Sequence, residues 1–125
     1  MTMNLHQSAI AEVDEANFGS VVLASEAPVL VAFLAPWSRP CQVLGSALDA
    51  VVAACAGKVK VVTINVDDNP DLGLVFEIQS IPTILYFVNG LACARIVGTA
   101  SKKAILAKLK GLNRTIIDRP SHDRA

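Results

Sequence analysis

The chain has 125 residues, of which 53% are hydrophobic and 18% charged, and its eleven basic residues are balanced by eleven acidic ones. This length fits one domain with a sizeable core, and the composition is typical of soluble globular proteins. Because the net charge is zero, no overall field attracts nucleic acid or an anionic membrane, so we expect neither as a partner.

The N-terminal segment shows neither the basic nor the apolar region of a signal peptide. No apolar run reaches the roughly 18 residues that a membrane span needs. We therefore expect a cytoplasmic protein. We expect its domain to cover residues 1–112, and residues 113–125, which have no sustained periodicity, to form a loosely ordered tail.

The first three elements are a weak strand, a short helix and a strong strand. Weak alternation over residues 8–13 predicts an edge strand, and Asp14 or Asn17 can cap a short helix after it. The apolar run 28–35 is too short for a core helix and is bounded by prolines. It predicts a central strand covered on both faces.

A long helix follows the turn at Trp37, because apolar residues recur there at helical spacing and Gly57 stands where a helix stop is expected. Cys41 falls on the same stripe, so its sulfur should lean toward the sheet. The stripe continues through Leu44, Leu48, Val51, Val52 and Cys55. Residues 59–66 predict a second strong strand, parallel to the first through a right-handed crossover.

The second half of the chain begins with a turn at residues 67–70 and a short helix, whose apolar positions are Leu72, Val75, Phe76 and Ile78. Residues 82–88 and 91–97 form an antiparallel hairpin, because Asn89-Gly90 between them tolerates the positive φ angles of a type I′ turn. Ser101 can cap a last amphipathic helix.

The segment from Ala35 to Cys41, with the sequence Ala-Pro-Trp-Ser-Arg-Pro-Cys, places one thiol at a helix start. A cysteine at position 38 would make it a Cys-x-x-Cys redox turn, in which one thiolate attacks a disulfide and the second resolves the mixed disulfide. Residue 38 is serine, so the turn lacks one of the two thiols.

The order of the elements and the Trp-x-x-Pro-Cys turn resemble the thioredoxin family over residues 8–112. Further matching segments are Asn-Val-Asp-Asp-Asn-Pro70, Ser-Ile-Pro-Thr83, Phe-Val-Asn-Gly90 and Val-Gly98. The resemblance implies an α/β thioredoxin fold, with a mixed five-stranded sheet flanked by four helices, and membership of the protein-disulfide oxidoreductases. It also implies a cis peptide bond before Pro82 and a partner-binding surface, which we assign to Trp37, Arg39, Pro40, Ile81, Pro82 and Gly98.

The sequence departs from the family pattern at the positions that carry the chemistry. The family has cysteine at the position of Ser38, usually glycine at Arg39, commonly a buried aspartate at Ala32 and often lysine at Thr63. A serine hydroxyl stays protonated at neutral pH without a neighbouring base, and disulfide exchange needs sulfur as the attacking atom. We expect Ser38 to act as a helix N-cap rather than as a catalytic hydroxyl.

Cys41 is the sole thiol of the turn and has two interpretations. It is either a small apolar residue under the turn or a monothiol that forms mixed disulfides with glutathione or a thiol-bearing partner. Cys55 lies about 21 Å farther along the helix, outside disulfide reach. It reads as a core residue, and we expect Cys93 to be buried or half-buried.

No cofactor or metal site is expected. Three cysteines without metal-ligand spacing make a zinc site improbable, and His6 and His122 lie in the terminal segments. Asp67 and Asp68 are interpreted as turn and capping residues, and the lysines of the last helix (Lys102, Lys103, Lys108 and Lys110) as its solvated face.

Three functions remain open. The first is a monomeric polypeptide-binding module in which dithiol exchange is lost or much reduced, and the second is a monothiol redox protein that uses Cys41. The third is a Cys-to-Ser variant of an active disulfide reductase.

Overall fold

The computed structural model describes residues 10–112, and its five strands form one mixed sheet in the order β1-β3-β2-β4-β5. Strand β3 is parallel to β1 and β2, whereas β4 is antiparallel to β2 and β5. The strands are β1 (Ala11–Glu12), β2 (Val29–Leu34), β3 (Lys60–Asn65), β4 (Thr83–Val88) and β5 (Leu91–Val97). The helices are η1 (Gly19–Leu23), α2 (Arg39–Cys55), α3 (Pro70–Val75) and a C-terminal helix over residues 102–112. This is the α/β architecture that the sequence predicts.

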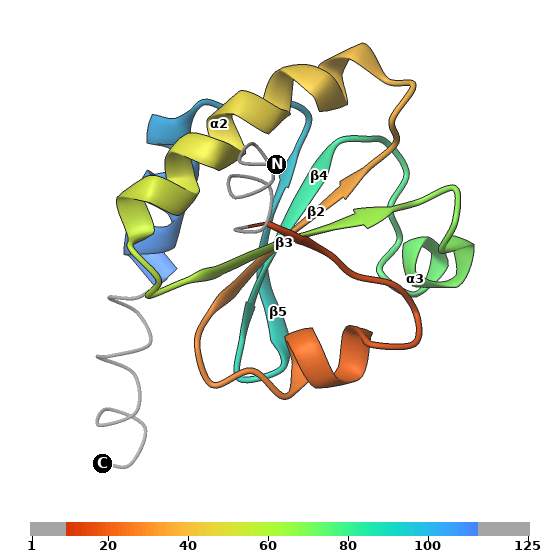
Figure 1. Ribbon diagram of the computed structural model, residues 1–125, viewed down its shortest axis with the longest axis horizontal. Helices are drawn as coiled ribbons and strands as arrows, with labels where there is room; N and C mark the ends of the chain where they lie inside the picture. Colours follow the sequence, from red (N-terminus) through yellow and green to blue (C-terminus); the bar gives the residue numbers. More distant parts are fainter. Residues whose placement is uncertain (1–9, 113–125) are drawn as a thin grey trace, which may run out of the picture.

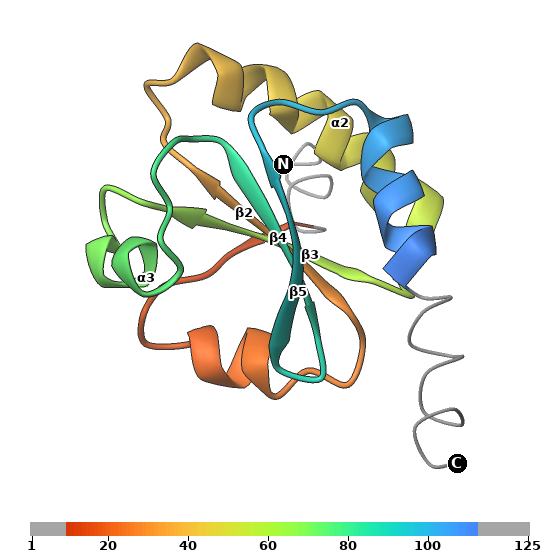
Figure 2. The same cartoon turned by 180° about the vertical axis from the view of Figure 1, so that it is seen from behind.

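The helices cover the sheet in two layers (Figures 1 and 2). One face carries α2 and the C-terminal helix, whose core side chains include Leu44, Leu48 and Ile105. The other face carries η1 and α3 and is packed with aromatic rings. Strand β2 is buried over its first five residues because it lies between these layers and between two neighbouring strands.

The aromatic layer is a cluster of phenylalanines with ring centroids 5.4 to 6.2 Å apart, in tilted and edge-to-face arrangements. Its members are Phe18, Phe33, Phe76 and Phe87. Such ring pairs add about 0.5–1.5 kcal/mol beyond the area that they bury. Since Phe76 directly follows α3, this packing holds the end of α3 against the sheet.

The C-terminal helix begins and docks through specific hydrogen bonds. The Ser101 hydroxyl accepts from the amide of Ala104 at 3.1 Å, which confirms the predicted cap. The buried Tyr86 hydroxyl on β4 donates to the carbonyl of Ile105 at 2.9 Å. Burial raises the pKa of Tyr86, because the phenolate would lose its hydration there.

The hairpin turn between β4 and β5 is confirmed, with φ angles of 53° at Asn89 and 80° at Gly90. A Cβ atom at Gly90 would lie 2.9 Å from the carbonyl oxygen of Leu23. Glycine is therefore required here both by the backbone conformation and by the packing of the turn against the end of η1.

The predicted stop of α2 is confirmed: Ala56, with a left-handed φ of 52°, is the C-cap, and Gly57, with a φ of 83°, follows it directly. Two other helix predictions need correction. Helix α3 ends at Val75 instead of reaching Ile78, and Val75 is exposed. Asp14 and Asn17 accept from each other's amides, but this segment ends in a π-helical turn.

The boundaries of the strands are close to the predicted ones. Most begin or end one residue inside the expected range, and β5 matches it over Leu91–Val97. The first strand is Ala11–Glu12, and the start of its predicted range, together with residues 113–125, lies outside the described residues.

Candidate functional site

The turn between β2 and α2 is arranged as a helix start. The Ser38 amide donates to the carbonyl of Ala35 at 3.2 Å, and the Ser38 hydroxyl accepts from the amide of Cys41 at 3.3 Å. Ser38 is only 5% exposed and has the extended backbone of an N-cap. Pro40, in the first turn of α2, lacks an amide hydrogen at a place where none is needed. The predicted capping role of Ser38 is confirmed.

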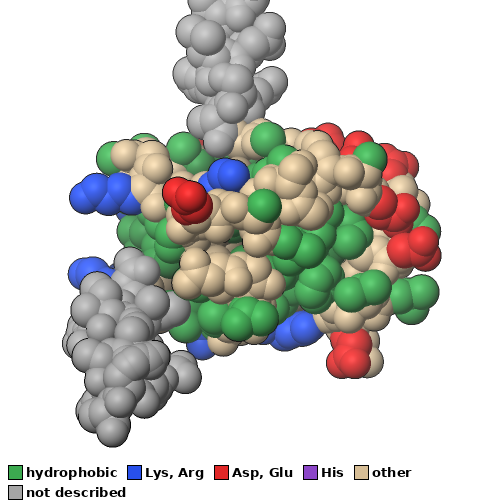
Figure 3. All heavy atoms as spheres, turned by 90° about the horizontal axis from the view of Figure 1, so that it is seen from below, with side chains coloured by type: hydrophobic (Ala, Val, Ile, Leu, Met, Phe, Trp, Pro, Cys, Tyr) green, Lys and Arg blue, Asp and Glu red, His purple; other side chains and the backbone are tan. Residues whose placement is uncertain are grey.

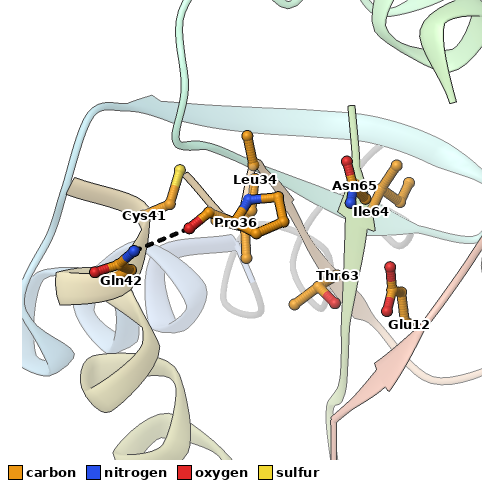
Figure 4. A pocket seen from close by; sticks show the side chains of 9 residues that line it. Glu12, Leu34, Pro36, Cys41, Gln42, Thr63, Ile64 and Asn65 are labelled. Atoms are coloured by element: carbon orange, nitrogen blue, oxygen red, sulfur yellow. Dashed lines mark hydrogen bonds between the residues drawn. The ribbon is translucent and has the colours of Figure 1, made fainter. Parts of the chain in front are cut away.

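The thiol of Cys41 lies on the inner side of α2, as predicted, and the residue is 5% exposed. It forms part of the wall of an open pocket of about 210 Å³ beneath the turn. Figure 4 shows Cys41 and Gln42 in the first turn of α2 on one side of this pocket, with Thr63 and Glu12 on the other. Arg39, the first residue of α2, is exposed to solvent.

Gln42 fastens the turn to the helix, because its side-chain amide donates to the carbonyl of Pro36 at 2.9 Å (Figure 4). Sequence reasoning had not identified Gln42, since a glutamine on an exposed helix face carries no local signal of such a role. The bond fixes the path of the chain between the end of β2 and the buried thiol.

Strand register aligns two of the positions at which the sequence departs from the family pattern. Ala32 on β2 is the Cα partner of Thr63 on β3, which is in turn the partner of Glu12 on β1. Paired residues point to the same face, here the face covered by α2. A lysine at position 63 would therefore lie beside position 32, where alanine offers no charge to pair with it.

Three backbone segments meet at the edge of the sheet beside the turn. Phe33 pairs with Thr83, so the end of β2 lies next to Pro82, whose carbonyl accepts from the amide of Gly98 at 2.8 Å. The peptide bond between Ile81 and Pro82 is cis, and Gly98 has a φ of 93°. The structure thus brings Ile81, Pro82 and Gly98 together near the turn that carries Trp37.

Trp37 is the most prominent side chain at this edge, with 69% of its surface exposed. Its indole nitrogen donates to the Asp67 carboxylate at 2.7 Å, which restrains a ring that would otherwise rotate in solvent. This bond joins the β2–α2 turn to the β3–α3 turn. Sequence reasoning treated Asp67 only as a turn residue because the two turns are thirty positions apart.

The cysteines are all free, as the sequence predicts. Cys55 is buried in the layer under α2, and this burial raises the pKa of its thiol. The expectation for Cys93 is wrong: it is exposed, and its thiol donates to the carbonyl of Leu91. Strand β5 lies at the edge of the sheet, and its Cys93 face has no helix over it.

No group of three or more potential metal-ligating side chains lies within residues 10–112. Asp67 forms a turn, since its amide donates to the side-chain oxygen of Asn65 at 2.9 Å. His6 and His122 lie outside the described residues. In the same part of the chain, no helix is long and apolar enough to cross a bilayer.

Comparison with known proteins identifies the family. The family model "Thioredoxin" matches residues 9–111. Thioredoxin of Haemophilus influenzae is 42% identical over 95 residues, which cover 76% of this chain and 89% of the relative. Thioredoxin of Synechocystis sp. is 40% identical over 103 residues, covering 82% and 96%. Thioredoxin M5, chloroplastic, of Oryza sativa is 40% identical over 96 residues, covering 77% of this chain and 56% of the relative. The chain therefore belongs to the thioredoxin family.

Proposed function

We propose that this protein binds polypeptide segments in a groove beside the β2–α2 turn and that it has lost most or all dithiol exchange. The groove is lined by Trp37, Arg39, Pro40, Ile81, Pro82 and Gly98. The protein works as a monomer in the cytoplasm, without a metal or cofactor.

The loss of exchange rests on one observation, the burial and use of the Ser38 hydroxyl as an N-cap. Ser38 is 5% exposed and its hydroxyl accepts from the amide of Cys41, so the oxygen faces the helix instead of an incoming disulfide. An alcohol also lacks the acidity and the sulfur that exchange requires. Ala32 supports the same conclusion. It occupies a buried position on β2, and alanine has no carboxylate there to take up a proton.

Binding is supported by the exposed indole of Trp37 next to the Ile81–Pro82 segment. A large aromatic side chain held at the surface by a hydrogen bond supplies contact area at little cost in conformational entropy. Ile81 also lines an open pocket of about 520 Å³ that continues toward α3. An extended segment of a partner can fill this hollow with apolar side chains.

The monothiol alternative, with Cys41 as the reactive group, has weaker support. A thiol in a 5% exposed residue reacts only when the turn opens, and Arg39 is directed to solvent. Iodoacetamide labelling tests this alternative in a Cys93→Ser background, which removes the exposed thiol, with Cys41→Ala added as the control. Labelling of Cys41 at the rate of a free peptide thiol or faster would support a monothiol role.

The decisive experiment measures reduction of insulin disulfides with dithiothreitol and, separately, with thioredoxin reductase. We expect turnover at least about a hundredfold below that of a dithiol relative, because the attacking thiolate is missing. Turnover near that of the relative contradicts the proposal. Full activity of the Ser38→Cys protein would instead favour the third interpretation, a Cys-to-Ser variant of an active reductase.

A further inference from the structure

Charge is unevenly distributed over this neutral chain. Five exposed carboxylates, which we call the acidic edge, follow β1 and β3: Asp14, Glu15, Asp67, Asp68 and Asp71. No lysine or arginine occurs within residues 10–23 or 61–78, the segments that form this end. Figure 3 shows acidic side chains gathered at the end of the molecule that carries α3 in Figure 1.

Hydrogen bonds hold the acidic edge together. The Glu15 carboxylate accepts from the amide of Asp71 at 3.1 Å, and the Glu15 amide donates to the side chain of Asn69 at 3.0 Å. Asn69 is buried and also donates to the carbonyl of Asn65 at 3.0 Å. The carboxylates are therefore kept near one another by the backbone of two turns, and their mutual repulsion is not relieved by a basic side chain from those turns.

Apolar side chains are exposed directly beside the acidic edge. Leu74 is 76% and Val75 68% exposed, and both lie one helical turn after Asp71. Leu74 and Ile81 line the same open pocket. An apolar surface next to carboxylates whose own segments supply no basic side chain matches a segment that carries apolar and cationic side chains together.

We propose that the partner segments are basic, with lysine or arginine beside apolar residues, and that the acidic edge selects them while Leu74 and Val75 hold the apolar side chains. This inference rests on the proposed function, because it names the class of polypeptide that the same groove takes. It extends the binding surface from the Trp37 turn along α3.

The other charges near this surface do not cancel the acidic edge. Within residues 10–112, two basic side chains lie on or beside this surface, against five carboxylates: Arg39 is exposed at the Trp37 end of the groove. The guanidinium of Arg95 donates to the carbonyls of Phe76 and Glu77, at the far end of α3 from Asp71. Lys102, Lys103 and Lys108 are exposed on the C-terminal helix, which covers the opposite face of the sheet. That helix exposes no large apolar side chain, so a second copy of this chain is a poorer occupant than a separate basic segment.

Trp37 is the only tryptophan of the chain, so its fluorescence reports binding directly. Three tryptophan-free peptides are compared, with the same central Val-Ile-Leu and flanks of lysine, glutamine or glutamate. We expect the lysine peptide to bind about tenfold more tightly than the glutamate peptide at low salt. This ratio should shrink as the ionic strength rises past about 0.15 M.

Substitutions test which residues cause the preference for the lysine peptide. Asp68→Asn with Asp71→Asn should reduce the ratio to between about twofold and threefold, because each surface charge contributes a factor of about two. Asp67 is left intact because it binds the reporter indole. The matched control is Asp49→Asn, an exposed carboxylate on α2, which should keep the tenfold ratio. Leu74→Ser should weaken all three peptides alike, and Leu91→Ser, of similar exposure on β5, should weaken none.

The outcomes separate the two proposals. If none of the peptides binds, both the groove and its selectivity are overturned. If all bind with equal affinity, or the ratio survives in the Asp68→Asn, Asp71→Asn protein, the groove stands and the basic partner is overturned. Sedimentation that shows self-association abolished by the same double substitution would identify a second copy as the occupant and likewise overturn the inference.

Discussion

The two faces of the sheet are packed with different side chains. Beneath α2 and the C-terminal helix the core is mainly aliphatic, with Cys55 and Tyr86 as exceptions, and the Tyr86 hydroxyl donates to the helix backbone. Beneath η1 and α3 it is a cluster of phenylalanine rings. The aliphatic face lies under Ser38 and Cys41, where the chemistry would occur, whereas the aromatic face holds α3 and the acidic edge. Stability is therefore shared between the faces, but we expect binding to depend on the aromatic one.

The largest expected effect comes from removing a ring of the aromatic face. Phe18→Ala should lower the free energy of unfolding by about 3–5 kcal/mol, because Phe18 packs on both Phe76 and Phe87. It should also weaken peptide binding by loosening α3. Urea unfolding and Trp37 fluorescence titrations measure the two effects.

The matched substitution on the aliphatic face is Leu48→Ala, at a fully buried position of α2. It should cost about 2–5 kcal/mol, yet leave the peptide affinity of the folded protein unchanged. Equal losses of peptide affinity in the Phe18→Ala and Leu48→Ala proteins would show that binding does not depend more on the aromatic face than on the aliphatic one.

An intermediate effect is expected from the hydrogen bond that Tyr86 makes on the aliphatic face. Tyr86→Phe should cost about 1 kcal/mol at neutral pH, since the carbonyl of Ile105 loses its buried donor. The raised pKa of Tyr86 means that the unfolded chain loses this proton first as the pH rises. Stability that is fully present below about pH 10 should then fall by up to about 1.4 kcal/mol per pH unit above it.

The measurement is the difference in unfolding free energy between the parent protein and Tyr86→Phe from pH 7 to 11. Both proteins carry Cys55→Ala, because Cys55, whose pKa is also raised by burial, adds to the raised pKa of Tyr86 and its contribution would not cancel in this difference. A difference that stays constant above pH 10 would show that the hydroxyl titrates as freely in the folded as in the unfolded chain.

The smallest effect concerns the start of α2. Ser38→Ala removes the acceptor for the amide of Cys41 and should cost about 0.5–1 kcal/mol, because the hydrogen bond is long at 3.3 Å. Ser46→Ala, an exposed site within the same helix, should change stability by less than about 0.5 kcal/mol. Equal effects of the two substitutions in thermal unfolding would contradict the capping role of Ser38.

Predictions from sequence succeeded where the signal was local. Prolines bound the apolar run of β2, Asn89-Gly90 determines the hairpin, and Ser38 precedes a clear helical stripe. The exposure of Cys93 was missed because alanine and cysteine alternate along β5 without a contrast in polarity. Which face of a strand is covered depends on the helices packed on it, and this is not encoded locally.

The candidate site likewise combines features that are visible locally in the sequence with features that depend on tertiary packing. The turn and its single thiol are visible in the sequence, but the pairing of Ala32 with Thr63 depends on a register between distant strands. Val75 was placed on the buried stripe of a longer helix, yet α3 ends there and leaves it in solvent. The apolar surface beside the acidic edge follows from this early end of the helix.

The three cysteines differ in access to solvent, so their reaction with a thiol reagent can report the separation of α2 from the sheet. Cys93 is exposed on an edge strand, while Cys41 and Cys55 are buried on the inner side of α2. A maleimide dye added to the native protein would mark one position at once, and the other two only as fast as α2 lifts from the sheet. A count of attached labels over time therefore follows the detachment of a single helix in the unaltered chain.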